Sequence, residues 1–128
     1  MIKPESIHLH KQSKTLEIGF SGVRYILPAE FLRVHSPSAE VRGHGVGQEV
    51  LVYGKIQVGI RNIAAAGNYG LYIHFDDGHD SGIFSWAYLH EMGQHQETLW
   101  QTYSDRLESA QQQRDPDTTV VQFLPPSS

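Results

Sequence analysis

The stretch from Gly67 to Leu89 constrains the fold of this 128-residue chain more than any other. It opens with the turn dipeptide Gly67-Asn68 and then alternates, so that Leu71, Ile73 and Phe75 share one face and Tyr72, His74 and Asp76 the other. Such alternation is typical of a β-strand with one buried face. A sharp turn follows at Asp77-Gly78, and Ser85 is a suitable N-cap for a helix. The stretch therefore predicts a strand, a polar turn and a helix start, and a site is expected here first.

The first half of the chain predicts an antiparallel meander. Three segments alternate in the same way and are separated by short turns: Ser6 to His10, Thr15 to Phe20 and Val23 to Leu27. Pro28 to Arg33 predicts a short helix with proline in its first turn. Lys55 to Asn62 also alternates, which predicts a strand that pairs with Tyr69 to Asp76 as a third hairpin.

Two helical patterns follow. Trp86, Leu89 and Met92 share one face of the first, and Gly93 is expected to break it because glycine is poor in a helix interior. The second is expected from about Gln94 to Gln113, with Trp100, Tyr103 and Leu107 as its apolar stripe. We therefore expect an α+β fold, a small and mostly antiparallel β domain with C-terminal helices packed at one end. Residues 1–115 form this domain, and 116–128 form a tail that either docks on it or frays.

Composition excludes several kinds of site and partner for this chain. The chain has no cysteine, which excludes disulfides, thiolate metal sites and cysteine nucleophiles. Its net charge is −4 and its 10 basic residues are scattered, so no nucleic-acid footprint is visible. No apolar run reaches membrane-spanning length, and the N-terminus has no secretion signal. We expect a cytoplasmic protein that binds neither nucleic acid nor membrane.

His74, Asp76 and His79 are candidate metal ligands. A histidine and a carboxylate on one strand face, with a second histidine nearby, match the donors of two-histidine-one-carboxylate iron sites. The alternative is that Asp76 and Asp77 only shape the turn. His79 is flanked by Gly78 and Asp80, so we expect it to be exposed.

The segment from Val34 to Gln48 is polar, glycine-rich and long for so small a domain, and such loops are often functional. It contains His35 and His44, which could assist a metal site. It lacks the Gly-Lys-Ser/Thr of a phosphate-binding loop, and no Gly-x-Ser-x-Gly elbow occurs in the chain, so no catalytic residue is predicted. The candidate binding residues are Arg33, Arg42, Asp77 and Trp86.

Two blocks of the sequence resemble a known family. They are Leu32 to Gly45, and Gly67 to Leu71 followed by Phe75 to Leu89. They are similar to the γ-butyrobetaine hydroxylase-like N-terminal domain family, over roughly Ser6 to Leu107. The resemblance implies a small, mostly β domain of the stand-alone bacterial type. In the carnitine-biosynthesis dioxygenases this domain precedes a catalytic iron/2-oxoglutarate domain that this chain is too short to contain. A similar segment is attached to a P-loop ATPase that handles iron–sulfur clusters.

The resemblance also bears on metal binding. In the dioxygenases the domain holds zinc through three cysteines and one histidine, and these positions fall here on Ser36, Ser38, Val41 and His79. Serine is a poor zinc ligand and valine is none, so this set does not rebuild a tetrahedral zinc site. His35, His44 and His79 could still form a histidine-rich site for iron or zinc if the loop folds over the turn.

Two functions remain open. The first is a non-catalytic accessory or binding module, linked to iron or iron–sulfur metabolism through family association alone. The alternative is a metal-binding protein, sensor or enzyme that uses the cluster around His79. For the module we expect a protein partner, and either a monomer or a weak homodimer.

Overall fold

The computed structural model describes residues 2–38, 41, 49–80 and 82–117. The elements, in chain order, are β1 (Ser6–His10), β2 (Thr15–Phe20), β3 (Val23–Pro28), α1 (Ala29–Val34), β4 (Ile60–Ala66), β5 (Gly70–Phe75), β6 (Ile83–Ser85), α3 (Trp86–Gln94) and α4 (Gln96–Ala110). The strands form two three-stranded antiparallel sheets, ordered β1-β2-β3 and β4-β5-β6. The predicted α+β class is confirmed.

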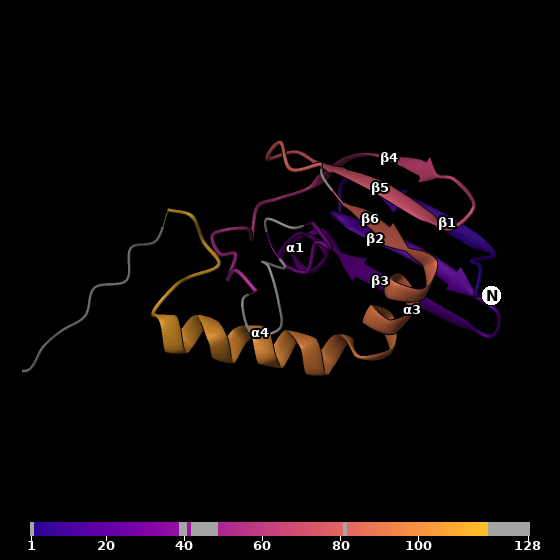
Figure 1. Cartoon of the computed structure of the whole chain (residues 1–128). Coiled ribbons are helices and arrows are strands. Elements are labelled where there is room, and N and C mark those ends of the chain that lie inside the picture. Colours follow the sequence, from indigo (N-terminus) through magenta and orange to yellow (C-terminus); the bar gives the residue numbers. More distant parts are fainter. Residues whose placement is uncertain (1, 39–40, 42–48, 81, 118–128) are drawn as a thin grey trace, which may run out of the picture.

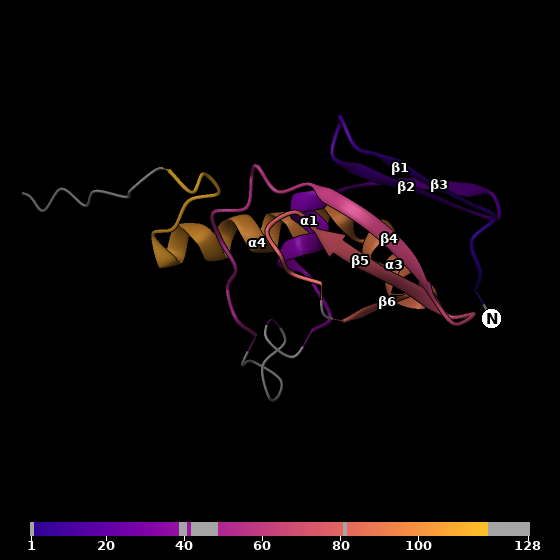
Figure 2. The ribbon, with the colours of Figure 1, turned by 90° about the horizontal axis from the view of Figure 1, so that it is seen from above.

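The two sheets lie as separate layers, with α1 at one end of the space between them (Figure 2). Helix α3 contacts both β3 and β6, so it closes one side of the two-layer stack. Helix α4 extends beyond the sheets (Figure 1). Among the described residues, no helix is both long enough and apolar enough to cross a membrane.

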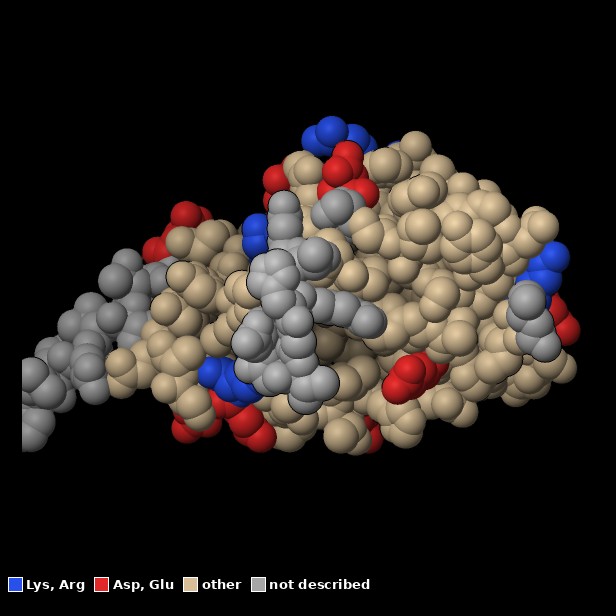
Figure 3. Space-filling model, viewed as in Figure 1, with Lys and Arg blue, Asp and Glu red and all other residues tan. Residues whose placement is uncertain are grey.

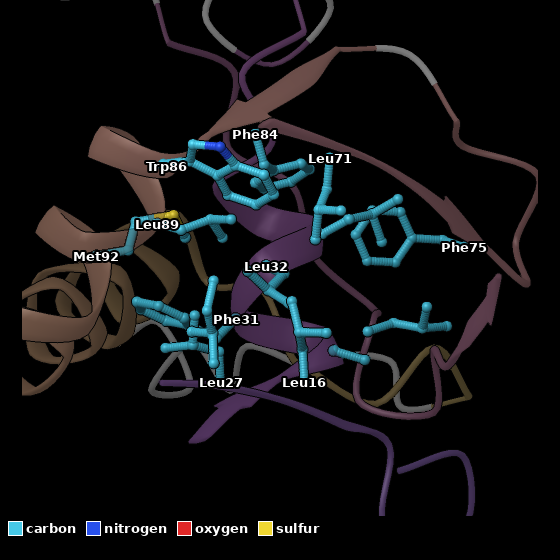
Figure 4. Close-up of a cluster of buried hydrophobic side chains, with 14 of the residues drawn as sticks. Leu16, Leu27, Phe31, Leu32, Leu71, Phe75, Phe84, Trp86, Leu89 and Met92 are labelled. Carbon is cyan, nitrogen blue, oxygen red and sulfur yellow. The ribbon is translucent and has the colours of Figure 1, made fainter. Parts of the chain in front are cut away.

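The core fills the space between the sheets, where side chains from both layers meet α1 and α3 (Figure 4). The alternation of apolar residues along β2 and β5 explains this core, because every second residue of each strand is buried. These residues are Leu16, Ile18 and Phe20 in β2 and Leu71, Ile73 and Phe75 in β5. Burying one such side chain contributes about 1.5–3 kcal/mol, so this shared core holds the layers together.

The predicted hairpins are confirmed. The first pairs Leu9 with Leu16, and the second pairs Leu16 with Leu27. The third joins β4 to β5 through a tight turn in which Gly67 has φ +57°, a conformation that favours glycine. Strand β6 adds three residues to the far edge of β5, and its short length gave no periodic signal in the sequence.

The strand predicted from Lys55 is wrong for residues 55–59, because β4 begins only at Ile60. The amide of Val58 donates to the carbonyl of Lys55, which bends the backbone into a turn. The amides of Gly54 and Ile56 donate to the carbonyls of Gln113 and Arg114, in the segment after α4. This part of the chain is therefore held by a distant segment instead of by a sheet.

The predicted break between two helices is present, but it lies two residues after Gly93. Helix α3 runs through this residue, and the two helices separate at His95. The aromatic ring of Tyr25 lies against Gly93 so closely that an added Cβ would stand 2.4 Å from the ring. Glycine is thus placed here for close packing. Helix α4 ends at Ala110, earlier than expected, where Gln111 adopts the left-handed conformation. Residues 118–128 of the predicted tail lie outside the described residues.

Candidate functional site

The polar turn after β5 folds back on its own strand. The amide of Gly78 donates to the carbonyl of Phe75 at 3.2 Å, and the amide of Phe75 donates to the carbonyl of His79 at 3.0 Å. Gly78 has φ +90°, which suits glycine. This geometry turns the His79 side chain inward, and the residue is only 8% exposed. The expectation that His79 is exposed is therefore wrong.

The imidazole of His79 meets the segment that follows α1. Its Nε2 lies 2.9 Å from Oγ of Ser36 and 3.4 Å from Oγ of Ser38. The two serines are 1% and 5% exposed. The amide of Ser38 donates to Oγ of Ser36, and the amide of Val41 donates to the carbonyl of Ser38. We call Ser36, Ser38 and His79 the serine–histidine cluster.

The family resemblance pointed to these positions. Val41, the fourth of them, is buried as well, at 6% exposure. The donors do not fit zinc, because two hydroxyls and an alkyl group stand where three thiolates are needed. Among the described residues, no group of three or more His, Cys, Asp or Glu side chains could hold a metal ion. Iron or zinc binding by this chain stays a prediction.

Asp77 forms a second cluster beside the first. Its Oδ2 accepts hydrogen bonds from Nε of Arg33 at 2.8 Å and from Nζ of Lys55 at 2.7 Å, and its Oδ1 accepts from the amide of His79 at 3.1 Å. Burial raises the pKa of Asp77, but the bonds from Lys55, the His79 amide and Arg33 outweigh it and hold the pKa at about 2. The carboxylate thus joins α1, the 49–59 segment and the turn. Nη1 of Arg33 is buried and has no hydrogen-bond partner in the part of the chain that the structure describes.

The other predicted metal ligands do not join His79. His74 lies on the outer face of its sheet, with Nδ1 at 3.8 Å from Oδ2 of Asp80. Asp76 is exposed. The ring of His35 packs against Phe31 and Tyr103, with centroids at 4.7 and 6.1 Å.

Trp86, predicted to bind a ligand, packs in the core, and its Nε1 donates to the carbonyl of Asn68. His44 and Arg42 lie outside the described residues. The sequence gave no sign that Lys55 reaches Asp77, since no local pattern links residues so far apart in the chain.

Comparison with known proteins decides the family. The model of the family described as "Gamma-butyrobetaine hydroxylase-like, N-terminal" matches residues 7–90. This chain belongs to that family. Among curated proteins no match is found.

Three solved structures resemble this member of the gamma-butyrobetaine hydroxylase-like N-terminal family. Two are NMR solution structures. One is 52% identical, with a TM-score of 0.83, and covers 97% of this chain and 98% of its own. The other is 41% identical, with a TM-score of 0.77, and covers 98% of this chain and 95% of its own. The third is the crystal structure of a DUF971 family protein of unknown function from Acidithiobacillus ferrooxidans. It is 32% identical, with a TM-score of 0.60, and covers 71% of this chain and 92% of its own.

Proposed function

We propose that this family member is a non-catalytic binding module that docks on a protein partner. The arrangement around His79 supports the non-catalytic part. The pair of Ser36 and His79 comes closest to a nucleophile and its base, but the hydroxyl-bearing residue is 1% exposed, and a substrate has no access to it. The alternative of a metal-dependent sensor or enzyme gains no specific support from the described residues.

The observation that carries the proposal is the outer face of the β4-β5-β6 sheet. Ala64, Tyr72 and Ile83 lie side by side in register across its three strands, and Asn62 lies beside His74 in the next row. Tyr72 is 38% exposed, and Tyr69 in the preceding turn is 55% exposed. We call Asn62, Ala64, Tyr69, Tyr72 and Ile83 the tyrosine face. These five residues include no Lys, Arg, Asp or Glu, and an acidic contact borders the face, that of His74 with Asp80 at 3.8 Å, beside Asn62. The right-hand part of Figure 3 is accordingly tan over a broad area, with charged residues at its margins.

The opposite sheet provides a contrast. On its outer face the Glu17 carboxylate lies 3.1 Å from Nε2 of His10 and 3.4 Å from Nε of Arg24. Such exposed ion pairs are typical of an ordinary solvated surface. Tyrosines surrounded by small and uncharged residues are typical of interface centres instead, because they bury a large area at a low cost in conformational entropy.

The chemistry of the tyrosine face also defines its partner. A charged surface docked here would lose its hydration and find no opposite charge in return. Nucleic acid and anionic membranes are therefore poor partners for this face. The partner that fits is a protein surface that is itself uncharged, with apolar groups to pack on the rings and acceptors for the tyrosine hydroxyls.

Family association supports the finer part of the proposal, a cytoplasmic role in iron or iron–sulfur metabolism. Loss of this chain in its source organism should then lower the activity of iron–sulfur enzymes when iron is scarce. Unchanged activity under iron limitation would contradict a role in iron–sulfur metabolism. It would have no bearing on the docking proposal.

Site-specific crosslinking tests the docking. A photo-reactive amino acid is placed at Tyr72 in one variant and at Ile26 in the control, and both are expressed in the source organism. Ile26 is a fair control, because it is 55% exposed and lies on the charged outer sheet face. We expect a discrete crosslinked species from position 72 only, and the captured protein, once purified, should bind this chain in isolation.

Equal crosslinking from both positions would contradict the proposal, and so would a captured protein that does not bind in isolation. A crosslink to a second copy of this chain would favour the weak homodimer in place of a separate partner. Sedimentation at several concentrations would then show an association that Tyr72→Arg abolishes.

A further inference from the structure

A small cavity of about 160 Å³ lies between the end of α1, the middle of α4 and the segment formed by Val50, Leu51 and Val52. It is distinct from the tyrosine face and from the serine–histidine cluster. Most of its wall is apolar and comes from Val34, Leu51, Val52, Leu99 and the ring of Tyr103. An apolar protein cavity of about 150 Å³ is large enough to take up benzene. The space therefore suits a molecule built on a single six-membered ring.

One polar group on this wall, the imidazole of His35, has a defined tautomer in its neutral form. Nδ1 of His35 lies 2.8 Å from the carbonyl oxygen of Phe31. A carbonyl can only accept, so Nδ1 carries the proton, and in the neutral ring Nε2 carries a lone pair. Nε2 has no hydrogen-bond partner among the described residues. His35 lines the cavity, and Nε2 is the acceptor that its neutral ring retains.

The surroundings keep this imidazole neutral. Burial lowers the pKa of His35, the bond to the Phe31 carbonyl raises it in part, and the positive charge of Arg106 lowers it again. The charged and titratable groups on the cavity wall, Arg106 and Tyr103, are already engaged. The hydroxyl of Tyr103 donates to the carbonyl of Val52 at 2.6 Å, and Nη2 of Arg106 donates to the carbonyl of Glu49 at 3.2 Å.

We propose that this cavity binds a small, largely apolar molecule that carries one hydrogen-bond donor, of the class of simple phenols, and that the donor binds Nε2 of His35. The apolar wall takes the ring, and the imidazole selects the donor. A binding site of this kind combines an apolar pocket with a few well-placed polar groups. The proposal is independent of the docking function, because it involves other residues.

NMR titration of the full chain with phenol and with toluene tests this inference. The two molecules have nearly the same shape, but only phenol has a donor. We expect saturable shifts at the amides of Val34, Leu51, Leu99 and Tyr103, and a shift of the His35 ring nitrogens with phenol. Phenol should bind about two- to tenfold more tightly than toluene, the effect of one neutral hydrogen bond.

A pair of variants adds a control. His35→Phe removes the acceptor and should abolish the preference for phenol. His90→Phe is the matched control, because His90 also packs against an aromatic ring, that of Phe20 at 4.9 Å. It should leave the preference for phenol intact. If His35→Phe does not fold, the comparison of phenol with toluene on the unmodified chain still tests the proposal. Equal affinities, shifts outside the cavity wall, or no saturation would each overturn the proposal.

Discussion

At the scale of single residues, the side chain of His79 ties the turn after β5 to the segment that follows α1. Its partners, Ser36 and Ser38, are more than 40 residues away in the sequence. A neutral hydrogen bond contributes about 0.5–1.5 kcal/mol, whereas a buried polar group left without a partner costs about 1–3 kcal/mol. The cluster therefore matters mainly because breaking it removes a hydrogen-bond partner from buried polar groups.

The first prediction uses the positions of the family zinc ligands. The variant Ser36→Cys/Ser38→Cys/Val41→Cys should bind one zinc ion per chain, because all four positions are buried and two of them already touch His79. Elemental analysis gives the stoichiometry, and cobalt substitution gives the absorption of tetrahedral thiolate ligation.

The matched control is the same triple variant with His79→Ala, which should bind zinc more weakly. The melting temperature of the triple variant should fall in chelator, and that of the unmodified chain should not. A triple variant that folds but takes up no zinc would show that the four positions do not converge as described.

The second prediction concerns Asp77. Its pKa lies at about 2 in the fold and at 3.8 ordinarily, so its ionised form stabilises the folded state. That stability is fully present above about pH 4 and is lost as the pH falls towards 2. Asp77→Asn should lower the free energy of unfolding at neutral pH and flatten its dependence on pH in this window.

Urea unfolding at pH 7, 4, 3 and 2 measures the effect. Asp105→Asn serves as the control, because Asp105 is exposed and the hydrogen bond that its carboxylate accepts comes from the nearby Gln101. A variant Asp77→Asn whose stability follows that of the unmodified chain at every pH would contradict the role assigned to this carboxylate.

At the scale of elements, the alternation of apolar residues was enough to predict β1, β2, β3 and β5, because each strand buries one face. The N-cap at Ser85 was predicted in the same way and is confirmed by the bond from the amide of Tyr88 to its Oγ at 3.1 Å. Residues 55–59 also alternate, but the amide of Ile56 donates to the carbonyl of Arg114 after α4, and the amide of Val58 donates to the carbonyl of Lys55. Local patterns cannot report such distant partners, and the burial of His79 was missed for the same reason.

Gly93 gives a prediction at this scale. Alanine is about 1 kcal/mol better than glycine inside a helix, so Gly93→Ala would stabilise a freely exposed helix. Here the added Cβ would meet the ring of Tyr25 at 2.4 Å, so we expect the free energy of unfolding to fall.

The double-mutant cycle with Tyr25→Ala separates the two effects. In the Tyr25→Ala background Gly93→Ala should become neutral or stabilising, because the ring is gone. Denaturant unfolding of the four proteins gives the coupling energy. A destabilisation by Gly93→Ala that persists without the ring would mean that something other than Tyr25 requires glycine here.

At the scale of the whole molecule, the two sheets share one core and present two different outer faces. The outer face of β1-β2-β3 carries the contacts of Glu17 with His10 and Arg24. The tyrosine face of β4-β5-β6 holds no Lys, Arg, Asp or Glu, and the His74–Asp80 contact lies beside it. The sequence predicted the class of fold and the family, and it placed Tyr72 on the outer side of its strand. It did not predict two separate sheets, because the pairing of distant strands leaves no local pattern.

The tyrosine face should be dispensable for folding. Tyr72→Arg alters a partly exposed residue, so the free energy of unfolding should stay within about 0.5 kcal/mol of the unmodified value. Thermal and urea unfolding check this before any binding measurement, and a larger loss would assign Tyr72 to the core instead of to an interface.

The most direct test of the binding module is calorimetric titration of the purified crosslinked partner into the unmodified chain, Tyr72→Arg and Ile26→Arg. An interface centre of this kind contributes about 2 kcal/mol or more, so Tyr72→Arg should weaken the binding by about thirtyfold. Ile26→Arg should leave it unchanged. Equal affinities for all three proteins, or an equal loss in both variants, would contradict the assignment of the tyrosine face as the docking surface.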